Sequence, residues 1–198
     1  MIRTSSSIVG IAAALVLVSA PGAQAAVTAK DAPSQADIVA AFPELTDGQF
    51  STEKVTKIGL PGKTCEETVR LKVKSGTYTT GASATVYPIV LTSTVELKTE
   101  AKAKAYMASY RKYAKKCSTY TQPETGATVT LTKGKTFRFG DESLTVDSQS
   151  VFDTGTNYSS SVLTRDGKRI SNVIAVDDAA VPASSVKPLA KVAAKKMK

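Results

Sequence analysis

Residues Tyr87 to Cys117 combine two hydrophobic periodicities, and together these constrain the fold more than any other part of the chain. From Tyr87 to Leu97 the odd-numbered positions are mainly apolar, which is the period-2 pattern of a strand with one buried face. Apolar and aromatic side chains then recur at helical spacing as far as Cys117, and Thr99 is a candidate N-cap. The stretch predicts a strand buried on its odd-numbered face, followed by an amphipathic helix.

Most of the remaining segments have the composition of strands. The candidates are residues 50–58, 69–73, 127–132, 136–139, 144–150, 158–164 and 169–176. Asp166-Gly167 joins the last two as a tight-hairpin signal. Further helices are expected after Ser34, ending at Pro43, and after Ser184 or Ser185. This order predicts one α+β domain over residues 34–198, in which a mainly antiparallel sheet is packed by helices on one face.

The N-terminal residues have the features of a signal peptide. Arg3 is followed by an apolar run from Ile8 to Ala20, which is shorter than the roughly 20 residues of a membrane-spanning helix. A small-residue cleavage pattern then predicts processing between Ala25 and Ala26. We therefore expect a signal peptide over residues 1–25, a flexible arm over 26–33 and a secreted, extracellular protein. We expect no lipid anchor, because no cysteine follows the apolar run.

The chain has two cysteines, Cys65 and Cys117. In an exported protein such a pair indicates one disulfide bond. The alternative, a reactive free thiol, has no neighbouring base in the sequence to support it. The bridge would join the end of the predicted helix to a distant segment, and the chain-entropy model values it at roughly 4 kcal/mol.

The chain is basic, with a formal net charge of +9. Such a charge attracts a protein to anionic surfaces such as phospholipid headgroups and acidic envelope polymers, although it is also compatible with a merely well-solvated surface. Phe137-Arg138-Phe139 has the aromatic and basic composition of some RNA-binding strands. We interpret it as a strand with both rings in the core. Nucleic-acid binding is not expected, because the protein is exported.

The segment Lys57 to Thr64, KIGLPGKT, ends like a phosphate-binding loop. A true loop of this kind needs a glycine six residues before its lysine and a helix after it. Here Lys57 occupies the glycine position, and a predicted strand follows instead of a helix. We therefore interpret the segment as a type II turn with Pro61 and Gly62 at its centre.

The composition excludes most catalytic chemistry. The chain contains no histidine, so the commonest general base and metal ligand is absent. We expect no cofactor and no metal site. The acidic pairs Glu66-Glu67, Asp141-Glu142 and Asp177-Asp178 leave a carboxylate-dependent hydrolase as the least favoured alternative. Each pair is interpreted as solvated charge, and the protein is predicted not to be an enzyme.

The tyrosines give the best candidate for a binding site. Tyr106, Tyr110 and Tyr113 fall on one face of the predicted helix, and Tyr87 lies on the strand before it. Such rings either line an apolar cleft between helix and sheet or pack in an ordinary core. We take a cleft lined by these four tyrosines as the candidate ligand site.

Three stretches resemble a family of actinobacterial extracellular sensor-like domains. They are VELKTEAKAKAYMASYRKYAKKC, RFGDESLTVD, and the tail from VLTRDGKRISNVIAVDD to VKPLAKVAAKKM. Together they cover roughly Thr85 to Lys198. Members occur on PknH-type receptor kinases and as free-standing secreted proteins or lipoproteins. The resemblance implies a sandwich-like α+β domain at the cell envelope that senses or binds a ligand.

The chain departs from the family in that it has no kinase, no transmembrane helix and no lipid-anchoring cysteine. It also has one expected disulfide where kinase-linked members have two, so no ligand residues are transferred. We expect a non-enzymatic secreted binding domain, a monomer, that holds a small or lipidic envelope ligand. The alternative is a basic protein that docks on anionic envelope polymers or on a protein partner.

Overall fold

The computed structural model describes residues 26–198. The expected signal peptide and its cleavage position at Ala25 therefore lie outside the described residues. Within them the helices are η1 (Ala29–Asp31), α1 (Gln35–Ala41), η2 (Pro43–Leu45), α2 (Glu100–Lys116) and α3 (Ala183–Lys196), where η marks a 3-10 helix.

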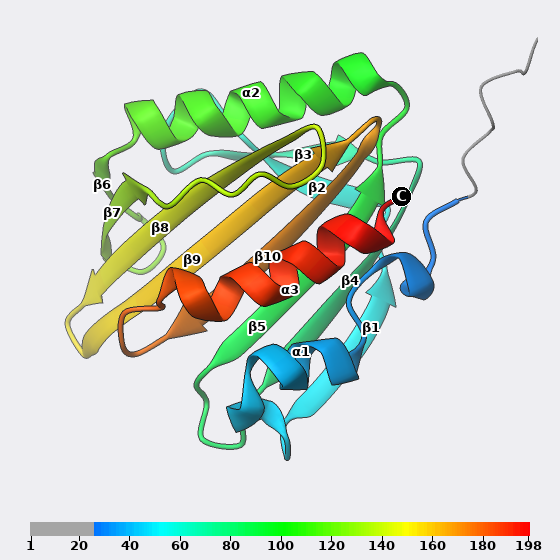
Figure 1. Ribbon diagram of the computed structural model, residues 1–198. Helices are drawn as coiled ribbons and strands as arrows, with labels where there is room; N and C mark the ends of the chain where they lie inside the picture. The colour runs from blue at the N-terminus through cyan, green and yellow to red at the C-terminus, as the bar shows by residue number, and fades with distance from the viewer. Residues whose placement is uncertain (1–25) are drawn as a thin grey trace, which may run out of the picture.

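An eight-stranded antiparallel sheet forms the centre of the domain, with strand order β1-β4-β5-β10-β9-β8-β7-β6 (Figure 1). Its strands are β1 (Gln49–Lys54), β4 (Ser75–Ala82), β5 (Ile89–Glu96), β6 (Thr119–Thr121), β7 (Thr128–Lys133), β8 (Glu142–Phe152), β9 (Gly155–Asp166) and β10 (Arg169–Asp177). A separate hairpin is formed by β2 (Lys57–Pro61) and β3 (Thr68–Lys72). The predicted α+β class and the mainly antiparallel sheet are confirmed.

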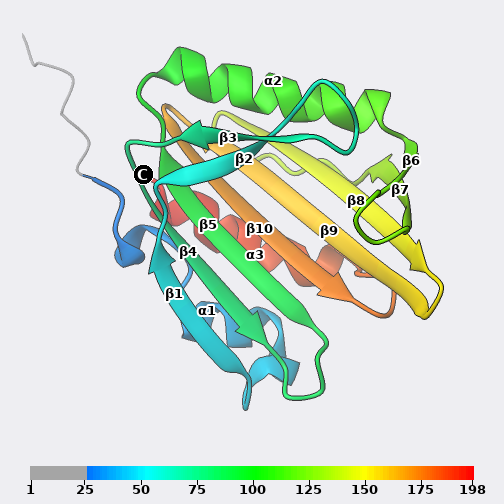
Figure 2. The ribbon, with the colours of Figure 1, turned by 180° about the vertical axis from the view of Figure 1, so that it is seen from behind.

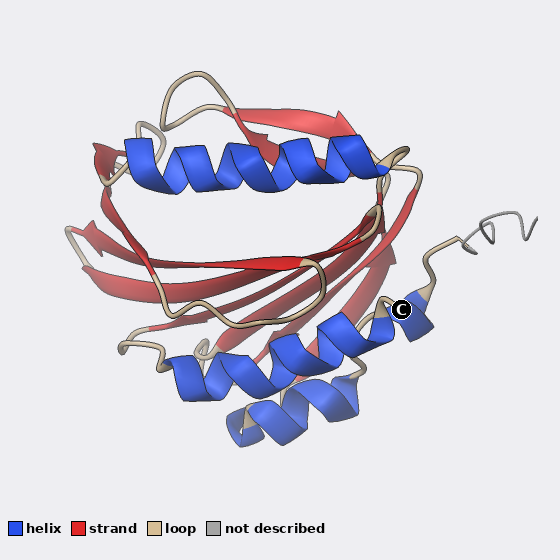
Figure 3. Cartoon of the chain, turned by 45° about the horizontal axis from the view of Figure 1, so that its top comes forward, coloured by secondary structure: helices blue, strands red, loops and turns tan. Residues whose placement is uncertain are grey.

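The helices cover both faces of the sheet, not one face as expected. Figure 3 shows α2 on one side and α1 with α3 on the other. The central strands therefore bury both sets of alternating side chains: Val162 packs in the core under α3, while its neighbour Leu163 packs in the core under α2. We call these the α3 face and the α2 face.

The α3 face is closed by α1 and α3. Ile38 of α1, Val173 of β10 and Leu189 of α3 are all completely buried in one hydrophobic cluster. Removing each such side chain from water contributes about 1.5–3 kcal/mol. This cluster fixes both helices to the sheet.

The α2 face is covered mainly at one end. There Leu97, Met107 and Leu163 form a second buried cluster, and the β2–β3 hairpin packs beside α2. Figure 2 shows the hairpin crossing this end of the sheet beneath α2. The hairpin and α2 together form the walls of the candidate sites described below.

The structure corrects the predicted burial of β5. The even-numbered residues Val90, Thr92, Thr94 and Glu96 are at most 1% exposed, whereas of the odd-numbered residues only Val95 is buried and Ile89, Leu91 and Ser93 are half-buried. The alternation is real, but the more polar set faces α3. Two of its four members, Thr92 and Thr94, have short hydroxyl side chains that fit under a closely packed helix.

Several local predictions are confirmed by hydrogen bonds. Ser34 caps α1, with Asp37 completing a capping box, and Thr99 caps α2 by accepting from Lys102 N. The predicted strand 50–58 is instead two strands, β1 and β2, which belong to different sheets.

Two more expectations differ from the structure. Residues 136–139 are not a strand, although Phe137 is buried and stacks on Phe139 with ring centroids 5.6 Å apart. Helix α3 begins at Ala183, with Pro182 at its N-cap, so Pro188 lies inside the helix and beyond its first turn.

Residues 26–33, expected as a loose arm, pack against one end of the sheet. They include η1, which is closed by a capping box between Thr28 and Asp31. Val27 and Ala32 are buried, and Asp31 forms an ion pair with Arg169 of β10 at 3.1 Å. These contacts hold the segment beside the C-terminal end of α3.

Candidate functional site

The tyrosines of α2 face the hairpin and the sheet. Tyr106 is buried, and its ring centroid lies 4.9 Å from that of the half-buried Tyr110. The Tyr110 hydroxyl donates to the Gly59 carbonyl of β2 at 3.2 Å. Burial raises the pKa of both phenols, so both are neutral hydrogen-bonding groups at physiological pH.

A cleft of about 350 Å³ lies between the β2–β3 hairpin, α2 and the sheet. Tyr106 and Tyr110 line it from the helix, and Tyr78 of β4 lines it from the sheet. Its volume falls within the usual range for small-molecule sites, about 300–1,000 Å³. Of the four tyrosines expected to line a helix–sheet cleft, Tyr106 and Tyr110 line this one.

The floor of this cleft is polar and its rim is basic. Ser93 and Asn172 lie opposite each other on β5 and β10, and Ser161 Oγ donates to Asn172 Oδ1 at 2.9 Å. Lys57 and Arg70, which also line the cleft, come from the exposed hairpin strands. The arrangement offers stacking surfaces, amide and hydroxyl groups, and two cations to a ligand.

Tyr87 does not join the other expected site residues. It lies in the loop between β4 and β5, at the end of the sheet away from α2 (Figure 1). Tyr78 occupies the position in the cleft that was expected for Tyr87, because it lies on the face of β4 that is turned toward α2. The sequence signal for Tyr78 is weak, because its strand was not predicted.

Tyr113 lies one turn beyond the cleft and supports the disulfide. Cys65 and Cys117 are bonded, as predicted, with their Cα atoms 5.5 Å apart. The Tyr113 hydroxyl lies 3.2 Å from the Cys65 carbonyl and 2.9 Å from the Tyr120 hydroxyl. Burial raises its pKa as well, so Tyr113 is a structural donor that joins α2 to the hairpin turn.

The KIGLPGKT segment forms strand β2 and the start of the hairpin turn. Gly62 does not adopt a positive φ, so the expected type II turn is not formed. A Cβ at Gly62 would instead lie 2.5 Å from the Glu67 side chain, whose Oε2 accepts from Lys63 N at 2.7 Å. A side chain at position 62 would therefore require the flexible Glu67 side chain to move aside.

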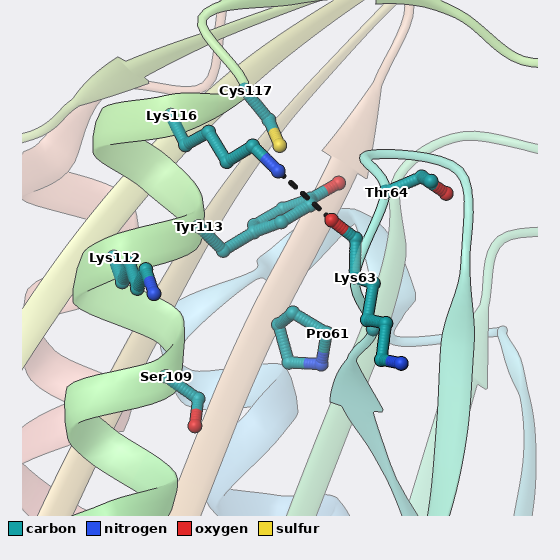
Figure 4. A pocket seen from close by; sticks show the side chains of 9 residues that line it. Pro61, Lys63, Thr64, Ser109, Lys112, Tyr113, Lys116 and Cys117 are labelled. Carbon is teal, nitrogen blue, oxygen red and sulfur yellow. Dashed lines mark hydrogen bonds between the residues drawn. The ribbon is translucent and has the colours of Figure 1, made fainter.

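A second pocket of about 350 Å³ lies beside this turn, between it and the C-terminal half of α2 (Figure 4). Its lining includes Lys63, Lys112 and Lys116 together with the Tyr113 ring. Lys116 Nζ donates to the Lys63 carbonyl at 2.8 Å. We call this the lysine pocket.

Of the three acidic pairs, Asp141-Glu142 is held by ion pairs with arginines. Asp141 and Glu142 both bind the buried Arg165, and Glu142 also binds Arg111 of α2. Burial alone would raise the pKa of Glu142, but its hydrogen bonds and the charges of the two arginines outweigh this and lower it. A carboxylate held ionised by arginines is poorly suited to act as a general acid.

Sequence reasoning missed a buried ionic cluster on the α3 face. Glu96 is fully buried and pairs with Lys74 and Lys168, while Arg169 bridges Asp31 and the Met197 carbonyl. Burial would raise the pKa of Glu96, but the bonds from the two lysines lower it. The available signal was the charged pair Lys168-Arg169 directly after the Asp166-Gly167 turn.

Within residues 26–198 no group of three or more acidic or cysteine side chains is placed to hold a metal ion. Among the same residues, no helix is both long and apolar enough to cross a membrane. Neither a protein-family model nor a curated protein matches the chain.

The fold defines a class of α+β domain that is known from solved structures. The chain is similar to the extracellular domain of PknH from Mycobacterium tuberculosis, with a TM-score of 0.56 and 11% identity over 84% of this chain and 92% of that chain. It also matches the Rv0999 ortholog from Mycobacterium smegmatis, with a TM-score of 0.44 and 10% identity over 84% and 97%. The first likeness establishes the fold relationship expected from the sequence.

Proposed function

We propose that the protein is a secreted, non-enzymatic binding domain that holds a small ligand in the cleft between α2, the hairpin and the sheet. The observation that carries the proposal is the convergence of Tyr78, Tyr106 and Tyr110 on a polar floor of Ser93 and Asn172. Apolar walls with a few placed polar groups are typical of small-molecule sites. The ligand class that fits is a ring or short chain that carries hydrogen-bonding groups.

The expected location outside the cell and the fold both support this proposal. The disulfide suits an oxidising compartment outside the cytosol. The solved structure with the similar fold is itself an extracellular domain. The carboxylates with lowered pKa are engaged with basic side chains, which argues against the hydrolase alternative.

The test is a native mass spectrum of the protein recovered from the supernatant of its own culture, compared with its denatured mass. We expect a discrete extra mass that is lost on denaturation. Asn172→Phe should abolish this mass by filling the floor of the cleft. Thr80→Phe is the matched control, because it adds the same ring to the same face of the sheet outside the cleft lining.

A bare chain for the wild type and the control would contradict the cleft proposal. Circular dichroism establishes that each variant is folded. Loss of the mass from both folded variants would also contradict the proposal, since the ligand would then be bound outside the cleft.

A second candidate function is docking on an anionic surface. The exposed side of α2 carries cations that are not buried in the core: Lys102, Lys104, Arg111, Lys112, Lys115 and Lys116. Such a surface would release its target as salt rises, because exposed charges are screened over about 10 Å at 0.1 M. Retention on anionic vesicles that persists at high salt would contradict this function.

A further inference from the structure

We infer that the lysine pocket binds the phosphate group of a phosphate monoester. The site lies outside the tyrosine cleft and does not depend on it. It occupies the corner where the hairpin turn meets the C-terminal half of α2 (Figure 4). Four observations carry the inference, namely the charge of the lining, the rigidity of the walls, the size of the pocket and its apolar side.

The lining is strongly cationic. Lys63, Lys112 and Lys116 all border the pocket, and no carboxylate does. None of the three ammonium groups forms an ion pair within residues 26–198; Lys116 Nζ instead donates to the Lys63 carbonyl. A phosphate monoester carries about −1.5 to −2 charges at pH 7 and three acceptor oxygens, which matches a group of lysines that lack acidic partners.

Other charges near the pocket are accounted for. Glu67 lies on the same turn, but its Oε2 accepts from the Lys63 backbone N–H at 2.7 Å. Glu66 is close enough to Tyr113 for its charge to raise the pKa of that phenol. The C-terminal end of α2 adds a partial negative charge, which the neighbouring lysines offset.

The walls are fixed before any ligand binds. The Cys65–Cys117 disulfide ties the turn to the end of α2, and the Tyr113 hydroxyl and Lys116 Nζ bind backbone carbonyls of the same turn. Within the turn, Gly62 N also donates to the Glu67 carbonyl at 2.8 Å. Because the backbone is held by several contacts, little backbone conformational entropy is lost when an anion is bound.

The size and the apolar wall favour an ester over a free ion. The pocket measures about 350 Å³, which is in the range of small-molecule sites. Pro61 and the Tyr113 ring provide an uncharged wall beside the lysines (Figure 4). The bound group is therefore a phosphate with a small organic substituent, supplied either by a lipid headgroup or by a soluble phosphate monoester.

The test uses glycerol 3-phosphate as the probe and follows amide shifts by two-dimensional NMR on the oxidised protein. Sodium chloride is matched for ionic strength, and glycerol is the uncharged control. We expect saturable shifts at the hairpin turn and at the end of α2 for the phosphate compound alone. The Lys112→Gln variant should bind roughly threefold to tenfold more weakly.

Lys115→Gln is the matched control, because Lys115 is an exposed lysine of the same helical turn that does not line the pocket. It should leave the affinity almost unchanged. Equal weakening by both substitutions would show a general charge effect and would overturn the inference. Shifts that do not saturate, or that chloride reproduces, would also overturn it.

Vesicles distinguish the two sources of the phosphate. If the group comes from lipid, phosphatidylcholine vesicles with phosphatidic acid should retain the protein, and glycerol 3-phosphate should release it. If it comes from a soluble ester, the probe should bind while the vesicles retain neither the wild type nor Lys112→Gln. Retention that Lys112→Gln and Lys115→Gln weaken equally would contradict the pocket.

Discussion

The two faces of the sheet differ in what they bury and in what they leave accessible. On the α3 face, Leu189 and Val173 are completely buried, and even polar side chains such as Thr94 are inaccessible to solvent. On the α2 face, the cleft and the lysine pocket each leave about 350 Å³ of space beside the helix. Both helices cover a buried hydrophobic cluster, but only α2 has the tyrosine cleft and the lysine pocket along its sides.

The difference arises from how each helix is attached. Helix α3 presents small residues, including Ala190 and Ala193, that let its backbone come close to the sheet. Helix α2 presents tyrosines, and the hairpin lies between part of the helix and the sheet. Large rings and an inserted hairpin hold the layers apart, so clefts form at their margins.

The largest expected effect comes from removing the disulfide. Replacing Cys65 and Cys117 together by serine should lower the free energy of unfolding by about 4 kcal/mol, since the bridge closes a 52-residue separation. The measurement is urea unfolding combined with hydrogen exchange. Amides of β2, β3 and the end of α2 should lose more protection than those of α3.

Leu189→Ala provides the matched perturbation of the other face. It should cost about 2–5 kcal/mol, and the protection should be lost first in α1 and α3. If both variants loosen the same amides, the two faces are not independent, and the comparison fails.

An intermediate effect is expected from the buried carboxylate Glu96. Its folded-state pKa lies below the ordinary value, because the lysine bonds outweigh the opposing effect of burial; the pKa of Asp31 is lowered in the same way by Thr28 and Arg169. A lowered pKa means that the stabilisation is present above the unfolded-state pKa and is lost as the pH falls through the folded-state pKa. Wild-type stability should therefore decrease below about pH 4.

Glu96→Gln tests the contribution of the Glu96 charge, because glutamine has nearly the same shape as glutamate. At pH 7 it should lower the free energy of unfolding by about 1–3 kcal/mol, because it removes two charge-assisted bonds. Between pH 5 and pH 3 it should also flatten the decrease in stability, as measured by urea midpoints. A variant with the same pH dependence as the wild type would show that Glu96 does not contribute to it.

The smallest effect is expected at Thr92 on the α3 face. Its hydroxyl is buried and has no hydrogen-bond partner within the described residues. Thr92→Val replaces that hydroxyl by a methyl group of similar size and should raise the free energy of unfolding by less than about 1 kcal/mol. A loss of more than about 1 kcal/mol in thermal unfolding would indicate that the hydroxyl is bonded in solution.

The sequence predicted several local features of the fold. Ser34 and Thr99 form the expected caps, and the disulfide joins the expected pair, because caps and cysteines act through short, specific contacts. The Asp166-Gly167 turn joins β9 and β10 as expected. These features depend on neighbouring residues or on a single covalent bond.

Features that depend on which element packs against each face of the sheet were not predictable. The even-numbered side of β5 is threonine-rich, and nothing in its composition shows that α3 covers it. The Tyr106–Tyr110 pair was expected, but its neighbour Tyr78 comes from a strand that the pattern did not reveal. The lysine pocket joins residues from two elements, so spacing along the sequence could not place them together.

Arg169 brings two distant parts of the chain to one point. Its guanidinium contacts Asp31 at 3.1 Å and the Met197 carbonyl at 3.0 Å, so η1 and the end of α3 lie side by side (Figure 1). A segment attached to the chain near either position would extend from the same corner of the domain. A domain tethered at this corner would point its β4–β5 and β8–β9 loops away from the attachment, free to face the surroundings.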